Sequence, residues 1–95
     1  MAAYVIANVT IDDPVRYEDY KRMVPATLTP FGGRFIVRGA KAEVLEGNGR
    51  PERLVILEFP SVEHARRWWN STEYAEARAL RQATSTGTLL ILEGV

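Results

Sequence analysis

Apolar and polar residues alternate along several short stretches of the chain, which is the pattern of β-strands with one buried face. Four stretches rich in β-branched and aromatic side chains predict strands, at residues 3–11, 32–39, 53–59 and 88–95. The segment AEVLE follows Gly39, Ala40 and Lys41. It predicts either a continuation of the second strand or a short separate strand. The segment GNGRPE predicts a loop from its composition.

Apolar spacings of three and four residues predict helices between the strands. Asp13 is the expected N-cap of the first helix, with Pro14 at its first helical position. Residues at helical spacing follow, namely Tyr17, Tyr20 and Val24. Pro25 disfavours helical geometry at the residue before it, so we expect either a kink or a second short helix over residues 25–31.

The second helical region is expected to begin at Ser61, which can cap a helix. Its apolar stripe consists of Val62, Ala65 and Trp69. Trp68 is offset by one position and is expected either to line a cleft or to remain half exposed. Ser71 interrupts this helix and is expected to cap a further one over residues 72–82.

The order of these elements is β, α, β, an optional β, then β, α, β. It predicts a single α+β domain over residues 1–95, a ferredoxin-like βαββαβ sandwich with an antiparallel sheet covered on one face by helices. Alternation along the strands assigns eight residues to the covered face: Val5, Ala7, Val9, Phe35, Val37, Val55, Leu57 and Phe59. The opposite face is expected to carry Tyr4, Ile6, Asn8, Thr10, Arg34, Ile36, Arg38, Leu54, Ile56 and Glu58.

The opposite face would expose a large apolar patch on a monomer, which soluble proteins rarely carry. A second copy of the chain is the expected cover, so we expect a homodimer that packs sheet against sheet. Charges inside such an assembly need partners, and Arg38 with Glu58 is the expected ion pair. A ligand site and plain solvent exposure are the other readings of these charges.

Charge and composition narrow the function classes. Twelve basic residues balance twelve acidic ones with no long run of either sign, which argues against a nucleic-acid partner. Cysteine is absent, which excludes disulfides and thiolate chemistry. No apolar run approaches the roughly 20 residues that span a bilayer, and the N-terminus lacks a basic flank and a cleavage-like site. We therefore expect no membrane partner and a cytoplasmic protein.

The single histidine, His64, is expected on the flank or the outer side of its helix. A metal or haem site needs more ligands of this kind, and a Ser-His-Asp arrangement does not fit a single histidine in a surface-like helix position. We expect no metal and no cofactor.

The chain resembles a known family at the motifs GGRFIVRG, VLEG, LVILEFPS, A..WWNSTEYAEARALR and the closing ILEGV. It is similar over nearly its whole length to the bacterial domain-of-unknown-function family 1330, DUF1330, within the dimeric α+β barrel superfamily. The resemblance implies a ferredoxin-like fold and a homodimer whose two sheets form the barrel. The wider superfamily includes cofactor-independent monooxygenases, muconolactone-isomerase-like enzymes, haem-binding members and ligand-sensing domains, and fold does not choose among them.

Candidate site residues fall into two groups. Glu58 is the first candidate for a general base, because desolvation on an apolar strand raises a carboxyl pKa, whereas an adjacent Arg38 would act against this by stabilising the charged form. Tyr20 is the other candidate for handling the proton. The candidate ligand-binding residues are Asn8, Arg34, Arg38, Trp69, Tyr74 and Arg81. Guanidinium groups beside aromatic rings suit a planar carboxylate or enolate, although arginine stems also pack over aromatics for structural reasons alone.

Together these features predict a small homodimer that binds a small aromatic or carboxylate metabolite. By analogy with the superfamily, its chemistry would be cofactor-independent isomerisation or oxygenation. The alternative is a non-catalytic ligand-binding or accessory dimer in which the charges only hold the two sheets in register.

Overall fold

The computed structural model describes residues 1–40, 42–49 and 52–95. Its elements follow one another as β1 (Ala3–Ile11), α1 (Pro14–Leu28), a 3-10 turn η1 (Thr29–Phe31), β2 (Arg34–Ala40), β3 (Arg53–Phe59), α2 (Val62–Trp69), α3 (Thr72–Thr84) and β4 (Ser85–Glu93). The strand prediction for AEVLE, residues 42–46, is wrong, because residues 42–45 have no regular structure and residue 46 lies in a bend. Of the predicted loop GNGRPE, residues 50 and 51 lie outside the described residues.

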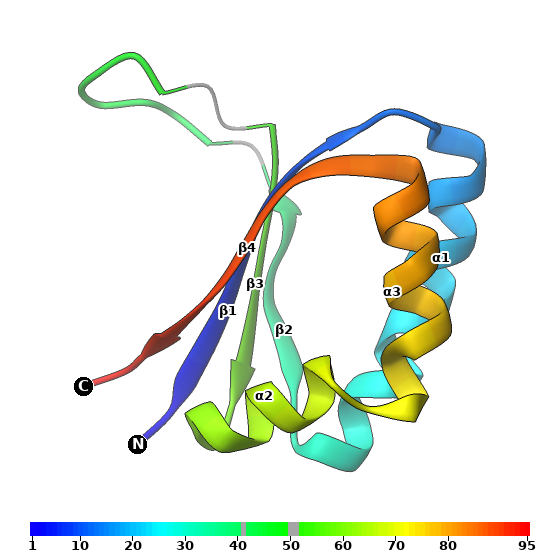
Figure 1. Cartoon of the computed structure of the whole chain (residues 1–95). Coiled ribbons are helices and arrows are strands. Elements are labelled where there is room, and N and C mark those ends of the chain that lie inside the picture. Colours follow the sequence, from blue (N-terminus) through cyan, green and yellow to red (C-terminus); the bar gives the residue numbers. More distant parts are fainter. Residues whose placement is uncertain (41, 50–51) are drawn as a thin grey trace.

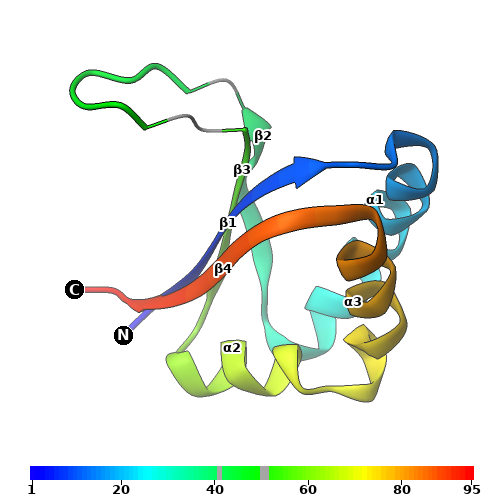
Figure 2. The ribbon, with the colours of Figure 1, turned by 45° about the horizontal axis from the view of Figure 1, so that its top comes forward.

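The four strands form one antiparallel sheet in the order β2-β3-β1-β4. Helices α1 and α3 lie side by side on one face of the sheet, and α2 crosses below its lower end (Figure 1). The turned view keeps all helices on the same side (Figure 2). The predicted α+β, ferredoxin-like βαββαβ arrangement is therefore confirmed. Over residues 1–40, 42–49 and 52–95, no helix lies on the other face of the sheet, which we call the bare face.

Helix α1 runs through Pro25 to Leu28, so the predicted second helix from residue 25 is wrong and only the turn η1 follows. Proline has no N–H and cannot bond the carbonyl four residues earlier, which is that of Lys21. The guanidinium of Arg38 supplies the missing donor, with Nη2 2.9 Å from the Lys21 oxygen. This bond joins β2 to α1.

Strand β2 contains two irregularities that change which side chains share a face. Phe35 pairs with Leu57, but the next pair is Val37 with Ile56, so Ile36 is an extra residue. Directly opposed residues of an antiparallel pair lie on the same face. Val37 therefore lies on the bare face and Arg38 on the helix-covered face, which reverses both assignments made by strict alternation.

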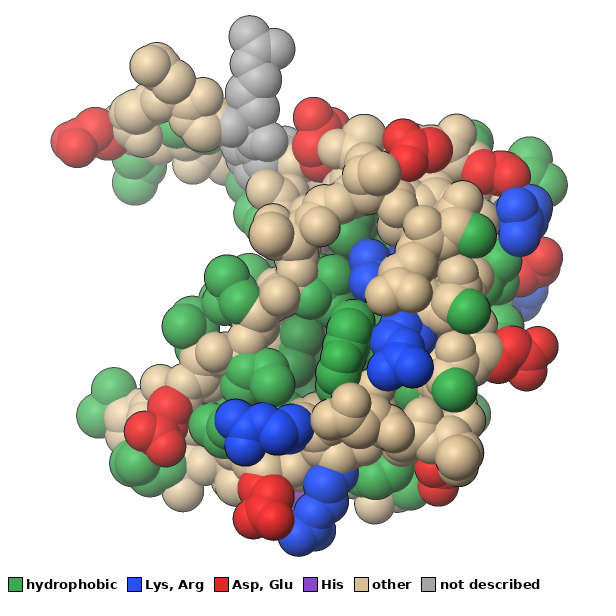
Figure 3. Space-filling view, viewed as in Figure 1, with side chains coloured by type: hydrophobic (Ala, Val, Ile, Leu, Met, Phe, Trp, Pro, Cys, Tyr) green, Lys and Arg blue, Asp and Glu red, His purple; other side chains and the backbone are tan. Residues whose placement is uncertain are grey.

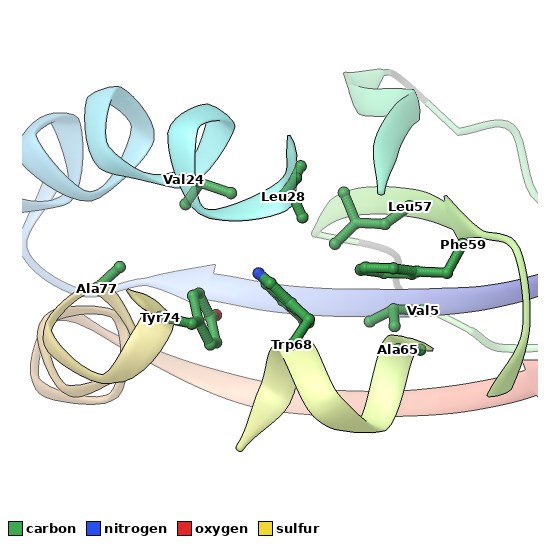
Figure 4. Close-up of a cluster of buried hydrophobic side chains, with 9 residues drawn as sticks. All are labelled: Val5, Val24, Leu28, Leu57, Phe59, Ala65, Trp68, Tyr74 and Ala77. Atoms are coloured by element: carbon green, nitrogen blue, oxygen red, sulfur yellow. The ribbon is translucent and has the colours of Figure 1, made fainter. Parts of the chain in front are cut away.

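The core lies between the sheet and the helices, with Trp68 at its centre (Figure 4). Trp68 is 1% exposed, packs against Tyr74 with ring centroids 4.0 Å apart, and donates from Nε1 to Thr27 Oγ1 at 3.0 Å. Trp69 is only partly buried. The expectation that Trp68 remains half exposed is therefore wrong, and Trp69 is the less buried of the two, because positions three and four after Ala65 flank the same helical stripe and spacing alone does not separate them.

Among the residues that the structure describes, no helix has the length and apolarity needed to cross a membrane.

Candidate functional site

A small cavity lies between the sheet and helices α1 and α3, with a volume of about 30 Å³. All four strands contribute to its floor, and the helices contribute Tyr17, Tyr20, Lys21, Val24, Trp68 and Arg81. Figure 3 shows the recess between β4 and the helices, with hydrophobic side chains inside it and basic side chains along its helical wall. We call this space the cationic cavity, because Lys21, Arg38, Arg53 and Arg81 line it together with apolar and tyrosine side chains.

Two of these arginines carry a donor with no partner. Arg81 is 7% exposed, and its Nε is buried without a hydrogen-bond acceptor among the described residues. The Nε of Arg53 is also buried without an acceptor among the described residues. The Arg53 guanidinium lies 5.7 Å from the centroid of the Tyr17 ring. The Tyr74 phenol is a hydrogen-bond partner of the Arg81 side chain, so what is unpaired on each of these two arginines is one buried N–H group. A buried donor without an acceptor is costly, and an acceptor bound in the cavity would remove that cost.

The other two cations are already engaged. Arg38 bonds the Lys21 carbonyl and lies 4.4 Å from the centroid of the Phe35 ring. Lys21 turns its ammonium towards Glu18, with Nζ 2.9 Å from Oε1. Arg53 and Arg81 are thus the two whose donors remain available inside the cavity.

A pair of tyrosine hydroxyls borders the cavity. Tyr20 Oη and Tyr74 Oη lie 3.0 Å apart, which connects α1 with α3. Burial raises the pKa of Tyr20 well above its usual value, and the Tyr74 hydroxyl beside it adds to the effect. Burial also raises the pKa of Tyr74, although its hydrogen bond with Tyr20 and the charge of Arg81 act in the opposite direction. Both phenols are therefore protonated near neutral pH and act as hydrogen-bond donors or acceptors, not as bases.

No Asp or Glu side chain is among the described residues that line the cavity. The wall consists of guanidinium groups, phenol hydroxyls and apolar surface. Such a set can bind an anion, or stabilise negative charge that develops on a substrate oxygen, because its donors are held in place in a water-poor setting.

A second, larger depression adjoins the cationic cavity. It has a volume of about 360 Å³ and is lined by Val5, Trp68, Trp69, Leu89, Leu90 and Ile91. Its residues come from α2, β1 and the edge strand β4. We call it the aromatic groove. Trp69 is held there by Arg78, whose Nη1 donates to the Trp69 carbonyl at 2.6 Å and whose guanidinium lies 5.3 Å from the centroid of the Trp69 ring.

The remaining candidates lie on the bare face, away from the cavity. Glu58 accepts from Arg34, with Nε at 2.7 Å and Nη2 at 2.6 Å from Oε1. The predicted Arg38–Glu58 pair is therefore wrong, because the extra residue in β2 moves Arg38 to the other face. Asn8 lies in the centre of the sheet, where its Oδ1 accepts from the Glu52 amide at 3.1 Å. The two residues expected to handle a proton, Glu58 and Tyr20, thus lie on opposite faces of the sheet.

The bare face is apolar around these polar groups. Ile6 pairs with Ile56 on one side and with Leu90 on the other, in adjacent strands. Leu90 and Leu92 are 46% and 47% exposed. These residues form the patch that the sequence predicted, extended by β4.

His64 is half-buried, which agrees with the expected position on the flank of its helix. Its Nδ1 lies 2.6 Å from Ser61 Oγ, and that oxygen also accepts from the His64 amide at 3.1 Å. Ser61 and His64 therefore cap α2. Among the described residues there is no group of three His, Cys, Asp or Glu that could hold a metal.

Three polar contributors to the cationic cavity were not named as candidates from the sequence, namely Tyr17, Lys21 and Arg53. Arg53 pairs with Val9 and shares the covered face with Val55 and Leu57, so alternation along β3 was a sufficient signal for it. Tyr17 lies one turn before Tyr20, and their ring centroids are 5.2 Å apart.

A family model described as "Domain of unknown function (DUF1330)" matches residues 2–95. No curated protein matches the sequence significantly.

Solved structures with the same fold share little sequence with this chain. The RPA0582 protein of unknown function from Rhodopseudomonas palustris is 20% identical, with a TM-score of 0.80 over 99% of this chain and 82% of that one. SnoaB from Streptomyces nogalater, described as a cofactor-independent oxygenase, is 14% identical, with a TM-score of 0.68 over 99% and 93%. A Bacteroides fragilis protein described as dimeric and ferredoxin-like is 12% identical, with a TM-score of 0.60 over 98% and 95%. At these identities the likeness shows the fold.

Proposed function

This chain belongs to the DUF1330 family, and from the chemistry of its interior we propose that it binds a small aromatic or carboxylate metabolite in the cationic cavity. The single observation that carries the proposal is Arg81, buried with an unpartnered Nε in a cavity that no described carboxylate lines. A bound carboxylate would supply the missing acceptor and balance the charge. Tyr20 is close enough to the same space to contact such a ligand.

Binding is the primary proposal, and catalysis is a second one that depends on it. SnoaB is described as a cofactor-independent oxygenase, which supports a reaction of that class or an isomerisation in this chain. Arg81 and the Tyr20 hydroxyl would stabilise negative charge on a substrate oxygen. Glu58 lies on the other face, so within one chain it is not positioned to take a proton from a ligand in the cavity. The alternative function, a non-catalytic ligand-binding or accessory dimer, requires the same binding step.

The proposal includes a homodimer formed through the bare face. The exposed leucines of β4 and the isoleucines of β1 and β3 support it, since such a patch on a monomer is costly in water. The Bacteroides fragilis neighbour is described as dimeric, which supports it further. The cytoplasmic location expected from the sequence stays a prediction.

The binding proposal is tested by titrating benzoate and benzamide into the protein and following its melting temperature. The two probes have nearly the same shape, but only benzoate carries a charge. We expect benzoate to stabilise the protein, by about 2.7 kcal/mol at a hundredfold excess over its dissociation constant, and benzamide to do much less.

Arg81→Gln should weaken benzoate binding by about tenfold or more, because a hydrogen bond to a charged group contributes about 1.5–3 kcal/mol. Arg67→Gln is the matched control, since Arg67 is exposed on α2 and pairs with Glu63. Equal binding of benzoate and benzamide, or unchanged benzoate binding by Arg81→Gln, would contradict the proposal.

A further inference from the structure

We infer that the cationic cavity and the aromatic groove form one binding site, whose ligand is an aromatic carboxylate with its anionic group beside Arg81 and its ring in the groove. This inference rests on the proposed function and narrows its ligand class. It assigns the two chemical features, charge and aromaticity, to two parts of one molecule.

The sizes of the two spaces determine which part of a ligand each can hold. The cationic cavity, at about 30 Å³, has room for a group of the size of one or two water molecules, such as a carboxylate. An aromatic ring does not fit there beside it. The groove, at about 360 Å³, has room for one or two fused rings. A carboxylate bound at Arg81 must therefore extend its remaining atoms elsewhere, and the groove is the adjoining space.

The cationic cavity and the aromatic groove share part of their lining. Val5, Trp68 and Leu89 line both the cavity and the groove, so the two spaces adjoin along these side chains. Arg81 and Tyr20 also line the cavity, whereas the described residues that line the groove are all apolar or aromatic. The lining thus changes from polar to apolar between the cavity and the groove, as an aromatic carboxylate requires.

The wall of the aromatic groove suits an aromatic ring. Trp69 is the partly exposed ring of this wall, and the buried Trp68 ring supports it, with centroids 6.5 Å apart and planes inclined by 60°. Aromatic side chains interact with a further ring by stacking or edge-to-face contact beyond their buried area. The bond from Arg78 to the Trp69 carbonyl fixes the backbone of this wall. A planar ring fits such a wall better than a flexible alkyl chain.

The test is a series of carboxylates of increasing apolar size, titrated by calorimetry into the full chain: acetate, benzoate and naphthalene-2-carboxylate. The dissociation constant should fall at least about tenfold from the first to the last, which is the lower end of what burying one large apolar side chain contributes. Cyclohexanecarboxylate has the size of benzoate without its π-face, and it should bind about two- to tenfold more weakly than benzoate.

Three variants separate the two parts of the site. Trp69→Ala should remove most of the gain between acetate and naphthalene-2-carboxylate and leave acetate binding unchanged, whereas Trp69→Phe, which keeps a ring, should retain most of it. Arg81→Gln should weaken all the carboxylates by a similar factor. Leu45→Ala is the matched control, because Leu45 is 92% exposed in the loop at the opposite end of the sheet from α2.

A second readout does not depend on affinity. The chain has two tryptophans, so its NMR spectrum holds two indole N–H signals, assigned with Trp69→Phe. Naphthalene-2-carboxylate should shift the Trp69 signal, and acetate should not.

The failures of this inference and of the proposed function are distinct. Carboxylates that bind through Arg81 with affinities independent of ring size and of Trp69→Ala would overturn the two-part site and leave the cationic cavity in place. Naphthalene-2-carboxylate binding that persists in Arg81→Gln would place the ring in the groove without the anchor, and would overturn both. No binding by any carboxylate would also overturn both.

Discussion

The hydroxyl of Tyr20 shows how a single residue of this site depends on its surroundings. It lies on α1 beside the cationic cavity and shares a hydrogen bond with Tyr74 of α3. Burial raises its pKa, so the phenol stays protonated where an exposed tyrosine would ionise. At the scale of the residue, Tyr20 is therefore protonated at neutral pH, and its hydroxyl can donate or accept a hydrogen bond.

This protonation state predicts a loss of stability at high pH. An unfolded tyrosine releases its proton near pH 10, whereas folded Tyr20 retains it to higher pH. The unfolded state then binds fewer protons, so the free energy of unfolding falls as pH rises above about 10, by up to about 1.4 kcal/mol per pH unit for one group. Below this pH the contribution is fully present.

Urea unfolding between pH 8 and 11 measures this effect in the wild type and in Tyr20→Phe. The variant should start from a lower stability, by about 1 kcal/mol, because Tyr74 loses its partner. Its stability should then fall less steeply above pH 10. Parallel curves for the two proteins would show that Tyr20 ionises alike in the folded and unfolded states.

Individual site residues were predictable from the sequence where a regular helix places them. Tyr20, Tyr74 and Arg81 were named as candidates on helices, and in the structure Tyr20 and Arg81 line the cavity while Tyr74 bonds the Tyr20 hydroxyl. Arg38 was named for the wrong reason, because its position depends on an extra residue in β2 that no local signal in the sequence reveals. Residues of α2 and β4 line the groove beside Trp69, and no pattern in the sequence predicts that these two elements lie next to each other.

At the scale of elements, one irregularity in a helix and one in a strand compensate each other. Pro25 leaves the Lys21 carbonyl of α1 without its helical donor, and the irregular β2 turns Arg38 towards that carbonyl. The sequence reading treated these features separately, as a helix break and as an ion pair across a dimer. Periodicity and capping residues were enough to predict the four strands and the three helices of the structure, but not that the irregularities of α1 and β2 meet in space.

A double-mutant cycle tests this link between α1 and β2. Arg38→Met should destabilise the wild type by about 1 kcal/mol, because the Lys21 carbonyl loses its donor. In a Pro25→Ala background the introduced amide can bond that carbonyl within the helix, so the same Arg38→Met change should cost less. We expect a coupling energy of at least about 0.5 kcal/mol in urea unfolding.

Arg34→Met is the matched control for the cycle, since Arg34 lies at the start of the same strand but bonds Glu58. Its effect on stability should be the same with and without Pro25→Ala. Additive effects for Arg38→Met as well would mean that the bond to Lys21 contributes nothing to stability.

The whole molecule has two layers, a sheet and the helices that cover one of its faces (Figure 1). Helices cover one face, where the core and the candidate site lie, and the other face presents Ile6, Ile56, Leu90 and Leu92 around the Arg34–Glu58 pair. A second copy of the chain would cover the apolar residues. It would also remove water from Arg34, whose side chain is 69% exposed, so the pair with Glu58 would have to persist inside the interface.

Light scattering after size-exclusion chromatography tests the dimer directly. The chain has a mass of 10.7 kDa, and the wild type should elute with twice that mass at micromolar concentration. Ile56→Lys places a charge beside Ile6 and Val37, at the centre of the bare face, and should give a monomer because an unpaired charge in the interface costs several kcal/mol. Val15→Lys, at an 80% exposed position of α1, should leave the dimer intact. A monomeric wild type would refute the dimer but not the binding proposal, because every group in the cationic cavity comes from one chain.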